Sequence, residues 1–297
     1  MRKIAVHGFI NADLIGLVDQ FSEVDQEVEF KDLQITPGGS AANVAVGLSR
    51  LGEEVYFLGA VGEDANTSFL LESLEKVRLD YVQKVTGVAS GTAIALVDNM
   101  GLRTMYTYPG ANLKYDPSQI PASFSENVGF LHLSSPNLNL AKSFLEWKEK
   151  NKNLKISLDP STLLTKKGLL FLEPLLSKSD ILFLNRSEIN DLFPDQEIDK
   201  AIQSLHEFGI EQIFVKLGKD GALSSFSSEG MIEHLMLPSL KVEAIDSTGS
   251  GDAFAVGVLY GIMRGWSQES ILQTGINLGG QVVSQIGARK GLPFSIE

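Results

Sequence analysis

Short apolar segments alternate with longer amphipathic segments along most of the chain. The apolar segments have the length of strands, as in KIAVHGF, VYFLGAVG, GFLHLS, KISLDP, ILFLN and QIFVKL, and helix-compatible residues separate them. Strands that are apolar throughout are buried on both faces of a sheet, and helical connections join them in parallel. The pattern therefore predicts an α/β fold, with a mainly parallel sheet between two layers of helices.

Two segments do not follow this alternation of apolar and amphipathic segments. They span residues 27–39 and 91–110. The second has β-rich arms around Asp98-Asn99-Met100-Gly101, where Asn and Gly favour a hairpin turn. Strands inserted into an α/β chain predict a small β lid, with lid strands from about 14–36 and 80–110. The sequence has no internal repeat and no linker-like segment, so we expect residues 1–297 to form a single domain that carries this lid.

The segment DSTGSGDAF, residues 246–254, combines glycines and hydroxyl residues with two aspartates at the start of an apolar helix. Free backbone N–H groups at residues 249–251 can form an anion hole, because the N-terminus of a helix binds phosphate. Asp252, in the first helical turn, is a candidate base. Phosphoryl transfer to an alcohol needs both functions. Taken alone, the segment is equally compatible with an ordinary helix start.

A second glycine-rich helix start, PGGSAANVAVGLSRLG, follows the polar turn INAD at the end of the first strand. The carboxyl ends of parallel strands and the helices that follow them converge on one edge of a sheet, where ligands bind. We therefore expect Asn11, Asp13, Gly39, Asn43 and Asp252 to meet there. Carboxylate and amide groups among glycines suit a polyhydroxylated ligand.

Composition excludes several classes of protein. The 297 residues carry a net charge of −12, which repels a polyanion, so we expect no nucleic-acid partner. The chain has no cysteine, which excludes disulfides, thiolate metal sites and cysteine nucleophiles. The first apolar run is too short for a signal peptide or a membrane span. We therefore expect a cytoplasmic protein with no membrane partner.

Together these segments resemble the PfkB or ribokinase-like carbohydrate kinases over nearly the entire chain. GGSAANVAVGLSRLGEEVYFLGAVGED is similar to the family's N-terminal signature and DSTGSGDAF to its C-terminal signature; GFINAD, YPGAN, FLNRSE and VKLGKDG resemble further segments. The resemblance implies a ribokinase-like three-layer α/β/α sandwich with a β lid. It also implies transfer of the ATP γ-phosphate to a hydroxymethyl group, with Mg²⁺ and often with activation by K⁺.

The resemblance assigns roles to individual residues. It makes Asp252 the catalytic base and forms the anion hole from Gly249, Ser250 and Gly251. It implies that the sugar is bound by Asn11, Asp13, Gly38, Gly39, Asn43 and Ser134. It implies that the nucleotide is bound by Asn185, Lys216, Gly218, Gly221, Asn277 and Gly280. Asn185 and Glu188 match an N-x-x-E pattern that helps to organise Mg²⁺ through water, and Asp246 with Thr248 corresponds to a monovalent-cation loop.

Three positions depart from ribokinase itself. Ser40 stands where ribokinase has a lysine, Ser134 where it has a ribose-binding glutamate, and Lys216 replaces a smaller polar residue. Two lost charged contacts count against ribose as the substrate, because a site built to bind a hydroxyl discriminates strongly when its partners change. The general kinase chemistry is unaffected.

The function that we expect is ATP-dependent phosphorylation of a small sugar. Two alternatives stay open: a nucleoside kinase of the same family, and a catalytically inactive sugar-sensing protein. An NAD-dependent oxidoreductase would need a glycine fingerprint that the chain lacks. The exposed strands of a small lid favour a homodimer formed through the lid.

Overall fold

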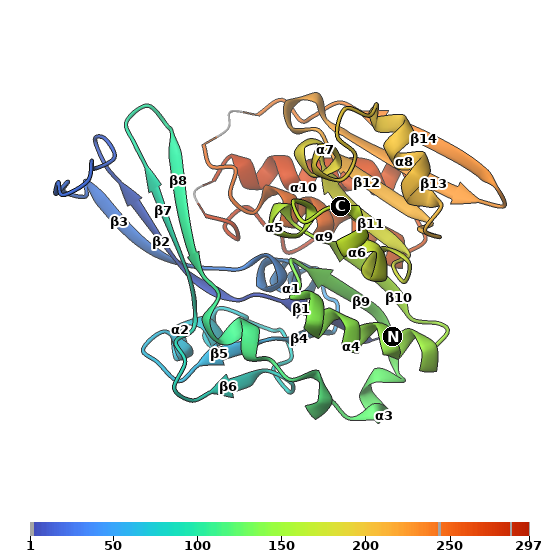
Figure 1. Cartoon of the computed structure of the whole chain (residues 1–297), viewed down its shortest axis with the longest axis horizontal. Coiled ribbons are helices and arrows are strands. Elements are labelled where there is room, and N and C mark those ends of the chain that lie inside the picture. The colour runs from blue at the N-terminus through green and yellow to red at the C-terminus, as the bar shows by residue number, and fades with distance from the viewer. Residues whose placement is uncertain (1–2, 243–244, 286, 297) are drawn as a thin grey trace.

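The computed structural model describes residues 3–242, 245–285 and 287–296. Its main element is an eight-stranded sheet in the order β14-β13-β12-β11-β10-β9-β1-β4 (Figure 1). The strands span Lys3–Gly8 (β1), Val55–Leu58 (β4), Val128–Ser134 (β9), Lys155–Asp159 (β10), Ile181–Asn185 (β11), Gln212–Lys216 (β12), Ala222–Ser228 (β13) and Met231–Leu237 (β14). Strands β12 to β4 are parallel, and β13 and β14 add an antiparallel edge. The mainly parallel sheet predicted from the apolar segments is confirmed.

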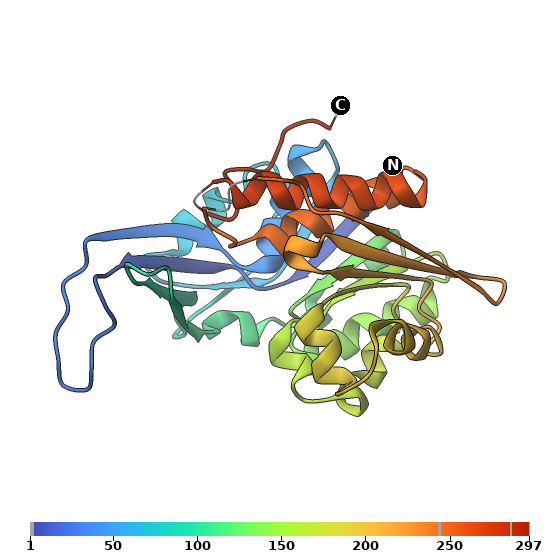
Figure 2. The ribbon, with the colours of Figure 1, turned by 90° about the horizontal axis from the view of Figure 1, so that it is seen from above.

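Helices cover both faces of this sheet (Figure 2), and each layer buries its own apolar core against it. One face carries α1 (Ser40–Arg50), α2 (Thr67–Glu72), α9 (Ser250–Met263) and α10 (Gln268–Val283). The other face carries α3 (Ala122–Ser125), α4 (Leu138–Lys150), α5 (Thr162–Thr165), α6 (Leu169–Leu176), α7 (Arg186–Leu192) and α8 (Ile198–His206). Within the described ranges, none of these helices has the length and hydropathy that a membrane crossing requires.

Helix α9 lies between α1 and α10, and small residues permit its close approach to both. A Cβ atom on Gly47 of α1 would lie 2.5 Å from the Val256 side chain of α9. A Cβ atom on Gly257 of α9 would lie 2.7 Å from the carbonyl oxygen of Thr274 in α10. Interiors this densely packed resist even one added methyl group. The packing therefore fixes the N-termini of α1 and α9 relative to each other.

A second sheet, in the order β3-β2-β7-β8, projects from the body of the molecule (Figure 1). Its strands are Asn11–Leu17 (β2), Asp32–Gly38 (β3), Gly91–Val97 (β7) and Arg103–Tyr108 (β8). The expected hairpin forms as β7 and β8, and its turn is closed by the Gly101 N–H, which donates to the Asp98 carbonyl at 3.0 Å. Strand β6 (Gln83–Val85) falls inside the second expected lid segment, but it pairs with β5 (Ala60–Gly62) in a separate two-stranded sheet.

The two faces of this projecting sheet differ in polarity. Asp13 and Arg103 occupy positions of the same face, which is turned toward the body. The cross-strand row Ile35, Leu14 and Ile94 lies on the opposite face. The side chains of Ile35 and Ile94 are 55% and 39% exposed. The sheet therefore presents polar groups inward and apolar groups to solvent, the reverse of the usual arrangement.

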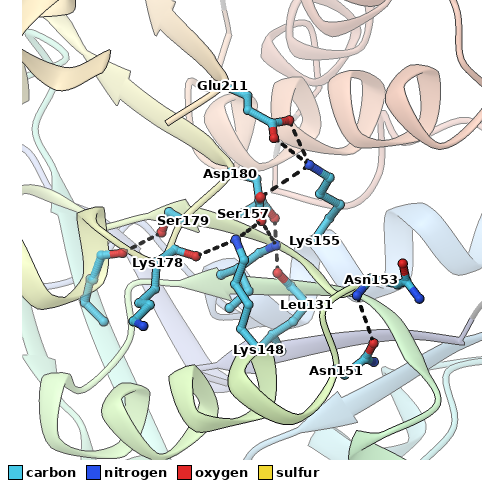
Figure 3. A network of polar contacts seen from close by, with 12 residues as sticks. Leu131, Lys148, Asn151, Asn153, Lys155, Ser157, Lys178, Ser179, Asp180 and Glu211 are labelled. Carbon is cyan, nitrogen blue, oxygen red and sulfur yellow. Dashed lines mark hydrogen bonds and ion pairs between the residues drawn. The ribbon is translucent and has the colours of Figure 1, made fainter. Parts of the chain in front are cut away.

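At the amino-terminal edge of the main sheet, Asp180 joins α4, β10 and the start of β11 (Figure 3). Its carboxylate accepts from Lys148 Nζ at 2.6 Å, from Lys155 Nζ at 3.3 Å and from the Ile156 N–H at 2.7 Å. Lys155 also pairs with Glu211 at 2.8 Å. The network lies at the edge opposite to the carboxyl ends of the strands, so its contribution is to stability.

Candidate active site

Helix α9 begins in a backbone conformation that only glycine adopts easily. Gly249 has a φ of 77°, and a Cβ atom there would collide with Ala288. Ser250 is the first residue of α9, and Gly251 and Asp252 follow in the first turn. Of the three predicted anion-hole donors, the Ser250 N–H donates to the Ser247 carbonyl oxygen at 3.3 Å, because the chain turns tightly before the helix. The N–H groups of Gly249 and Gly251 have no hydrogen-bond partner among the described residues, and they lie at the start of a 14-residue helix. This arrangement can bind an anion, as the sequence predicts.

Asn43 connects α1 to Asp252. Its Nδ2 donates to Asp252 Oδ2 at 2.8 Å, and its Oδ1 accepts from Arg289 Nε at 2.7 Å. Arg289 is buried and also donates to the carbonyl oxygens of Ser73 and Gly38, at 2.9 and 3.2 Å. A guanidinium can only donate, so Arg289 fixes the orientation of the Asn43 amide. The amide N–H group therefore points at the Asp252 carboxylate.

The surroundings of Asp252 suit a proton acceptor. Burial raises the pKa of the Asp252 carboxyl above its ordinary value, and the Asp159 charge adds to this. Hydrogen bonding from Asn43 and the charge of Lys216 oppose the shift. A raised pKa makes a carboxylate a better base near neutral pH.

Asp13 lies on the inward face of the projecting sheet, beside Gly38. A Cβ atom on Gly38 would collide with the Asp13 carboxylate, so a glycine is required there. Oδ1 of Asp13 is buried and has no hydrogen-bond partner among the described residues. Burial raises the pKa of Asp13 to about 6, although the charges of Arg289 and Arg103 oppose the shift. An unpartnered carboxylate oxygen in this position is available to a hydroxyl of a ligand.

The other predicted sugar contacts lie around Asp13. Asn11 Oδ1 accepts from Asn112 Nδ2 at 3.0 Å, which orients the Asn11 amide. Gly39 has a φ of 91° and caps the start of α1. Ser134 is buried at the carboxyl end of β9, in register with Gly8 of β1. Asn11, Asp13, Gly39 and Asn43 therefore lie on segments that meet at the carboxyl edge of the sheet.

A cluster of charged residues lies at the carboxyl ends of β10, β11 and β12. Lys216 Nζ donates to Asp159 Oδ2 at 2.8 Å. Asn185 caps α7 and accepts from the Glu188 N–H at 2.9 Å, while Glu188 Oε2 accepts from the Asn185 N–H at 2.9 Å. Burial raises the pKa of Glu188, the Asp159 charge raises it further, and Lys216 opposes both. The cluster brings two carboxylates together beside one ammonium group.

A cavity of about 650 Å³ lies next to this cluster. It is lined by Lys216, Gly218, Lys219, Gly221, Ala222, Ser239, Leu240, Lys241, Val242, Ser247, Ser250, Gly251, Phe254, Ile276, Gly279, Gly280 and Val283. The lysines and the α9 start lie among apolar side chains, a combination that suits a ligand with a flat apolar ring and an anionic tail. Of the two residues predicted on α10, Gly280 lines this cavity and Asn277 does not. The Asn277 side chain accepts from Gln273 Nε2 at 2.9 Å instead.

The loop before α9 is organised by Asp246. Its two carboxylate oxygens accept from the N–H groups of Thr248 and Gly287, each at 2.9 Å. Burial would raise the pKa of Asp246, but these hydrogen bonds outweigh it and lower the pKa. Arg103 of β8 reaches across and donates from Nη1 to Thr248 Oγ1 at 3.3 Å. The projecting sheet therefore touches the loop beside the anion hole.

Three residues of the site, Asp159, Arg289 and Arg103, are not among those predicted from the sequence. Asp159 ends the apolar segment KISLDP, so the rule that ligands gather at carboxyl ends of strands could have found it. Arg289 follows α10 in a segment with no periodic pattern, and Arg103 is one charge in a hairpin. Nothing in the sequence indicates the partners of these two arginines.

The chain is similar in sequence to known proteins of one family. The sequence matches the pfkB family of carbohydrate kinases over residues 1–294. A protein of Archaeoglobus fulgidus described as an uncharacterized sugar kinase is 33% identical over 85% of this chain and 100% of its own length. The ribokinase of Arabidopsis thaliana is 28% identical over 98% of this chain and 78% of its own. A nucleoside kinase of Methanothermobacter thermautotrophicus is 27% identical over 98% of this chain and 93% of its own.

A solved structure of the Arabidopsis thaliana ribokinase, complexed with ribose and ATP, has the same architecture. It covers 98% of this chain and 96% of its own, with a TM-score of 0.87 and 24% identity. The three-layer sandwich expected from the sequence is thereby confirmed.

Proposed function

Because this chain belongs to the pfkB family of carbohydrate kinases and is an ATP-dependent kinase, we propose that it phosphorylates a hydroxymethyl group of a small sugar. The observation that carries the proposal is the position of Asp252. Its Oδ2 accepts from Asn43 Nδ2 at 2.8 Å, and it follows Gly251, whose N–H has no hydrogen-bond partner among the described residues. The cavity lined by Gly251 would hold ATP. The inward face of the projecting sheet, which is the expected lid and carries Asp13, would hold the sugar.

In this proposal Asp252 accepts the proton of the attacking hydroxyl. The sugar oxygen forms a bond to the γ-phosphorus while the bond from that phosphorus to the β,γ-bridging oxygen breaks, and ADP leaves with the electron pair. Gly249 and Gly251 donate N–H groups to the phosphoryl oxygens, whereas the Ser250 N–H would first have to leave the Ser247 carbonyl oxygen, to which it donates at 3.3 Å. Preorganised donors of this kind contribute ~10²–10³-fold each, and a positioned base contributes ~10²–10⁴-fold.

The residues near the phosphates fit Mg²⁺. Asp159 and Glu188 supply carboxylate oxygens, the donors that this cation prefers, and Asn185 fixes Glu188 through the capping box. Mutual repulsion of the two carboxylates would be relieved by a cation. When bound, Mg²⁺ would neutralise phosphate charge. We expect Asp159 and Glu188 to hold it through its water molecules.

We also propose that a monovalent cation binds in the loop before α9. Asp246 stays ionised beside Thr248 and orders the loop that leads into the anion hole. A cation such as K⁺ in this loop would add positive charge near the phosphates. Replacing K⁺ by tetramethylammonium in the assay tests this, and equal turnover with both cations would show that K⁺ has no role in the reaction.

A nucleoside is the second candidate acceptor. Ser40 and Ser134 are shorter than the charged residues that ribokinase has at these positions, so the acceptor site has room for a base attached to the sugar. A sensor without catalysis is the third candidate, and the intact Gly249 to Asp252 segment counts against it.

The lid also supports a proposal about assembly, in which a second copy of the chain covers its outer face. The outward positions of β2, β3, β7 and β8 carry no charged residue, and Ile35, Ile94 and Tyr106 are exposed there. An apolar, uncharged face can pack against its own copy across a two-fold axis without electrostatic cost.

The proposed activity is tested by ATP consumption with Mg²⁺ and K⁺ across a panel of acceptors. The panel contains ribose, fructose, 2-keto-3-deoxygluconate, fructose 6-phosphate and nucleosides. We expect turnover with a free sugar. Turnover with nucleosides alone would select the second candidate, and ATP binding without turnover on any acceptor would favour the sensor.

A further inference from the structure

Lys216 lies between the proposed Mg²⁺ residues and the anion hole. It is the last residue of β12, and its Nζ is 2.8 Å from Asp159 Oδ2. A methyl group built on Gly251 would lie 3.4 Å from the same Nζ. The Lys216 side chain is 19% exposed, and it lines the cavity proposed for ATP. One ammonium group therefore touches Asp159 and also borders the start of α9.

Lys216 carries the positive charge that lysine ordinarily has near neutral pH, and its Nζ donates to Asp159 Oδ2 at 2.8 Å. An ammonium group has three donors, and among the described residues Nζ has one hydrogen-bond partner, so donors remain for a ligand. Lys219, in the 3₁₀ helix Gly218–Asp220, and Lys241 line the same cavity.

We propose that Lys216 is a catalytic residue of the kinase reaction, in which its Nζ binds a non-bridging oxygen of the γ-phosphoryl group during transfer. This inference rests on the proposed function. Asp159 holds Nζ at the anion hole before ATP arrives. Charge spreads over the three equatorial oxygens of the transferring group, and a fixed cation beside them stabilises that state. A shorter polar residue at this position, as in ribokinase itself, cannot supply that charge.

The two roles open to Lys216 make different predictions. If it binds phosphate, removing its charge weakens the binding of ATP and leaves the binding of adenosine unchanged. If it only neutralises Asp159, removing its charge lowers the stability of the fold and changes the affinity for both ligands by the same factor. Binding of nucleotide without acceptor therefore separates the roles, whatever the acceptor is.

The test compares Lys216→Met and Lys216→Arg with wild type. Isothermal titration gives Kd for ATP and for adenosine, with and without Mg²⁺, and stopped assays give kcat. We expect Lys216→Met to weaken ATP binding and to lower kcat by about 10- to 100-fold each, as for the loss of a hydrogen bond to a charged group. Adenosine affinity stays unchanged, and Lys216→Arg recovers part of the loss because it keeps the charge. Lys200→Met, an equal loss of charge on the exposed surface of α8, is the matched control.

Two outcomes would overturn the proposal. One is equal affinity of Lys216→Met and wild type for ATP, together with an unchanged kcat. The other is an equal loss of affinity for ATP and adenosine, with stability restored when Asp159→Asn is combined with Lys216→Met. Failure of the kinase proposal looks different, since wild type would then turn over no acceptor while nucleotide affinities still decide the role of Lys216. A wild-type protein that binds no nucleotide would overturn both.

Discussion

At the level of single residues, the position of the base depends on two side chains that orient each other through hydrogen bonds. Arg289 orients Asn43, and Asn43 donates to the base Asp252. Replacing Asn43 with Leu removes both hydrogen bonds at similar volume. We expect turnover to fall by about 10- to 100-fold, since a bond to a charged group is lost, and the free energy of unfolding to fall because Arg289 loses a partner in the interior. Steady-state kinetics and urea unfolding check this.

Ser49→Ala, a change at another buried polar position of α1, is the control for Asn43→Leu. It should leave turnover near the wild-type value. Equal loss of activity in the two variants would mean that helix packing, and not the Asn43 hydrogen bond, sets the activity.

Asp13 should cause kcat/KM for the sugar to fall at acidic pH. Burial raises the pKa of Asp13 to about 6, and the carboxylate must be ionised to accept hydroxyl groups from the sugar. Protonation below this pH removes the acceptor, so kcat/KM for the sugar should fall about tenfold per pH unit below about pH 6. A pH profile at saturating ATP measures this.

Asp13→Asn serves as the comparison, because it has no carboxylate to titrate. We expect a low kcat/KM for Asp13→Asn, and a pH profile that lacks the fall in kcat/KM near pH 6. If kcat/KM of Asp13→Asn still falls near pH 6, the titrating group is Asp252 and not Asp13, since burial also raises the pKa of Asp252.

At the scale of elements, the sequence predicted the two glycine-rich helix starts and the hairpin, because these depend on local turn chemistry. It also predicted that Asp13, Asn43 and Asp252 would gather, because parallel strands share one carboxyl edge. It did not predict the contacts of Lys216 and Arg289. Those join segments far apart in the chain, and only the packing of α1, α9 and α10 and the strand order decide them.

The same packing gives a prediction for Gly257. Alanine there would bring its Cβ atom within 2.7 Å of the Thr274 carbonyl oxygen in α10. Overpacking of this kind costs about 1–3 kcal/mol in the free energy of unfolding, measured by urea denaturation. Gln203→Ala, on the exposed side of α8, should stay within about 0.5 kcal/mol of wild type. A Gly257→Ala protein as stable as wild type would show that α9 and α10 pack less closely than described.

At the scale of the whole molecule, the two ends of the main sheet have different tasks. The site lies at the carboxyl ends of the strands. At the opposite edge, the Asp180 carboxylate links α4 and β10 to the start of β11 (Figure 3). Asp180→Ala would leave Lys148 without its carboxylate partner, and we expect a loss of about 3 kcal/mol of stability. Lys178→Ala breaks only an exposed pair with Glu149, which is worth about 0–1 kcal/mol. Thermal or urea unfolding compares the two, and equal losses would contradict this role of Asp180.

The lid face gives a prediction about assembly. A charge at the centre of the apolar row, as in Ile94→Glu, should convert a dimer to a monomer, because two copies would place like charges against each other. Light scattering after size exclusion measures the mass. A wild-type protein that is monomeric at micromolar concentration would contradict the proposed lid contact.

The role of Asp252 as the base for phosphoryl transfer is tested by a single turnover of labelled ATP on the acceptor, with Asp252→Asn beside wild type. We expect Asp252→Asn to fold, to bind ATP and sugar with near-normal Kd, and to transfer the phosphoryl group ~10²–10⁴-fold more slowly. Transfer at the wild-type rate by Asp252→Asn would show that Asp252 is not the base.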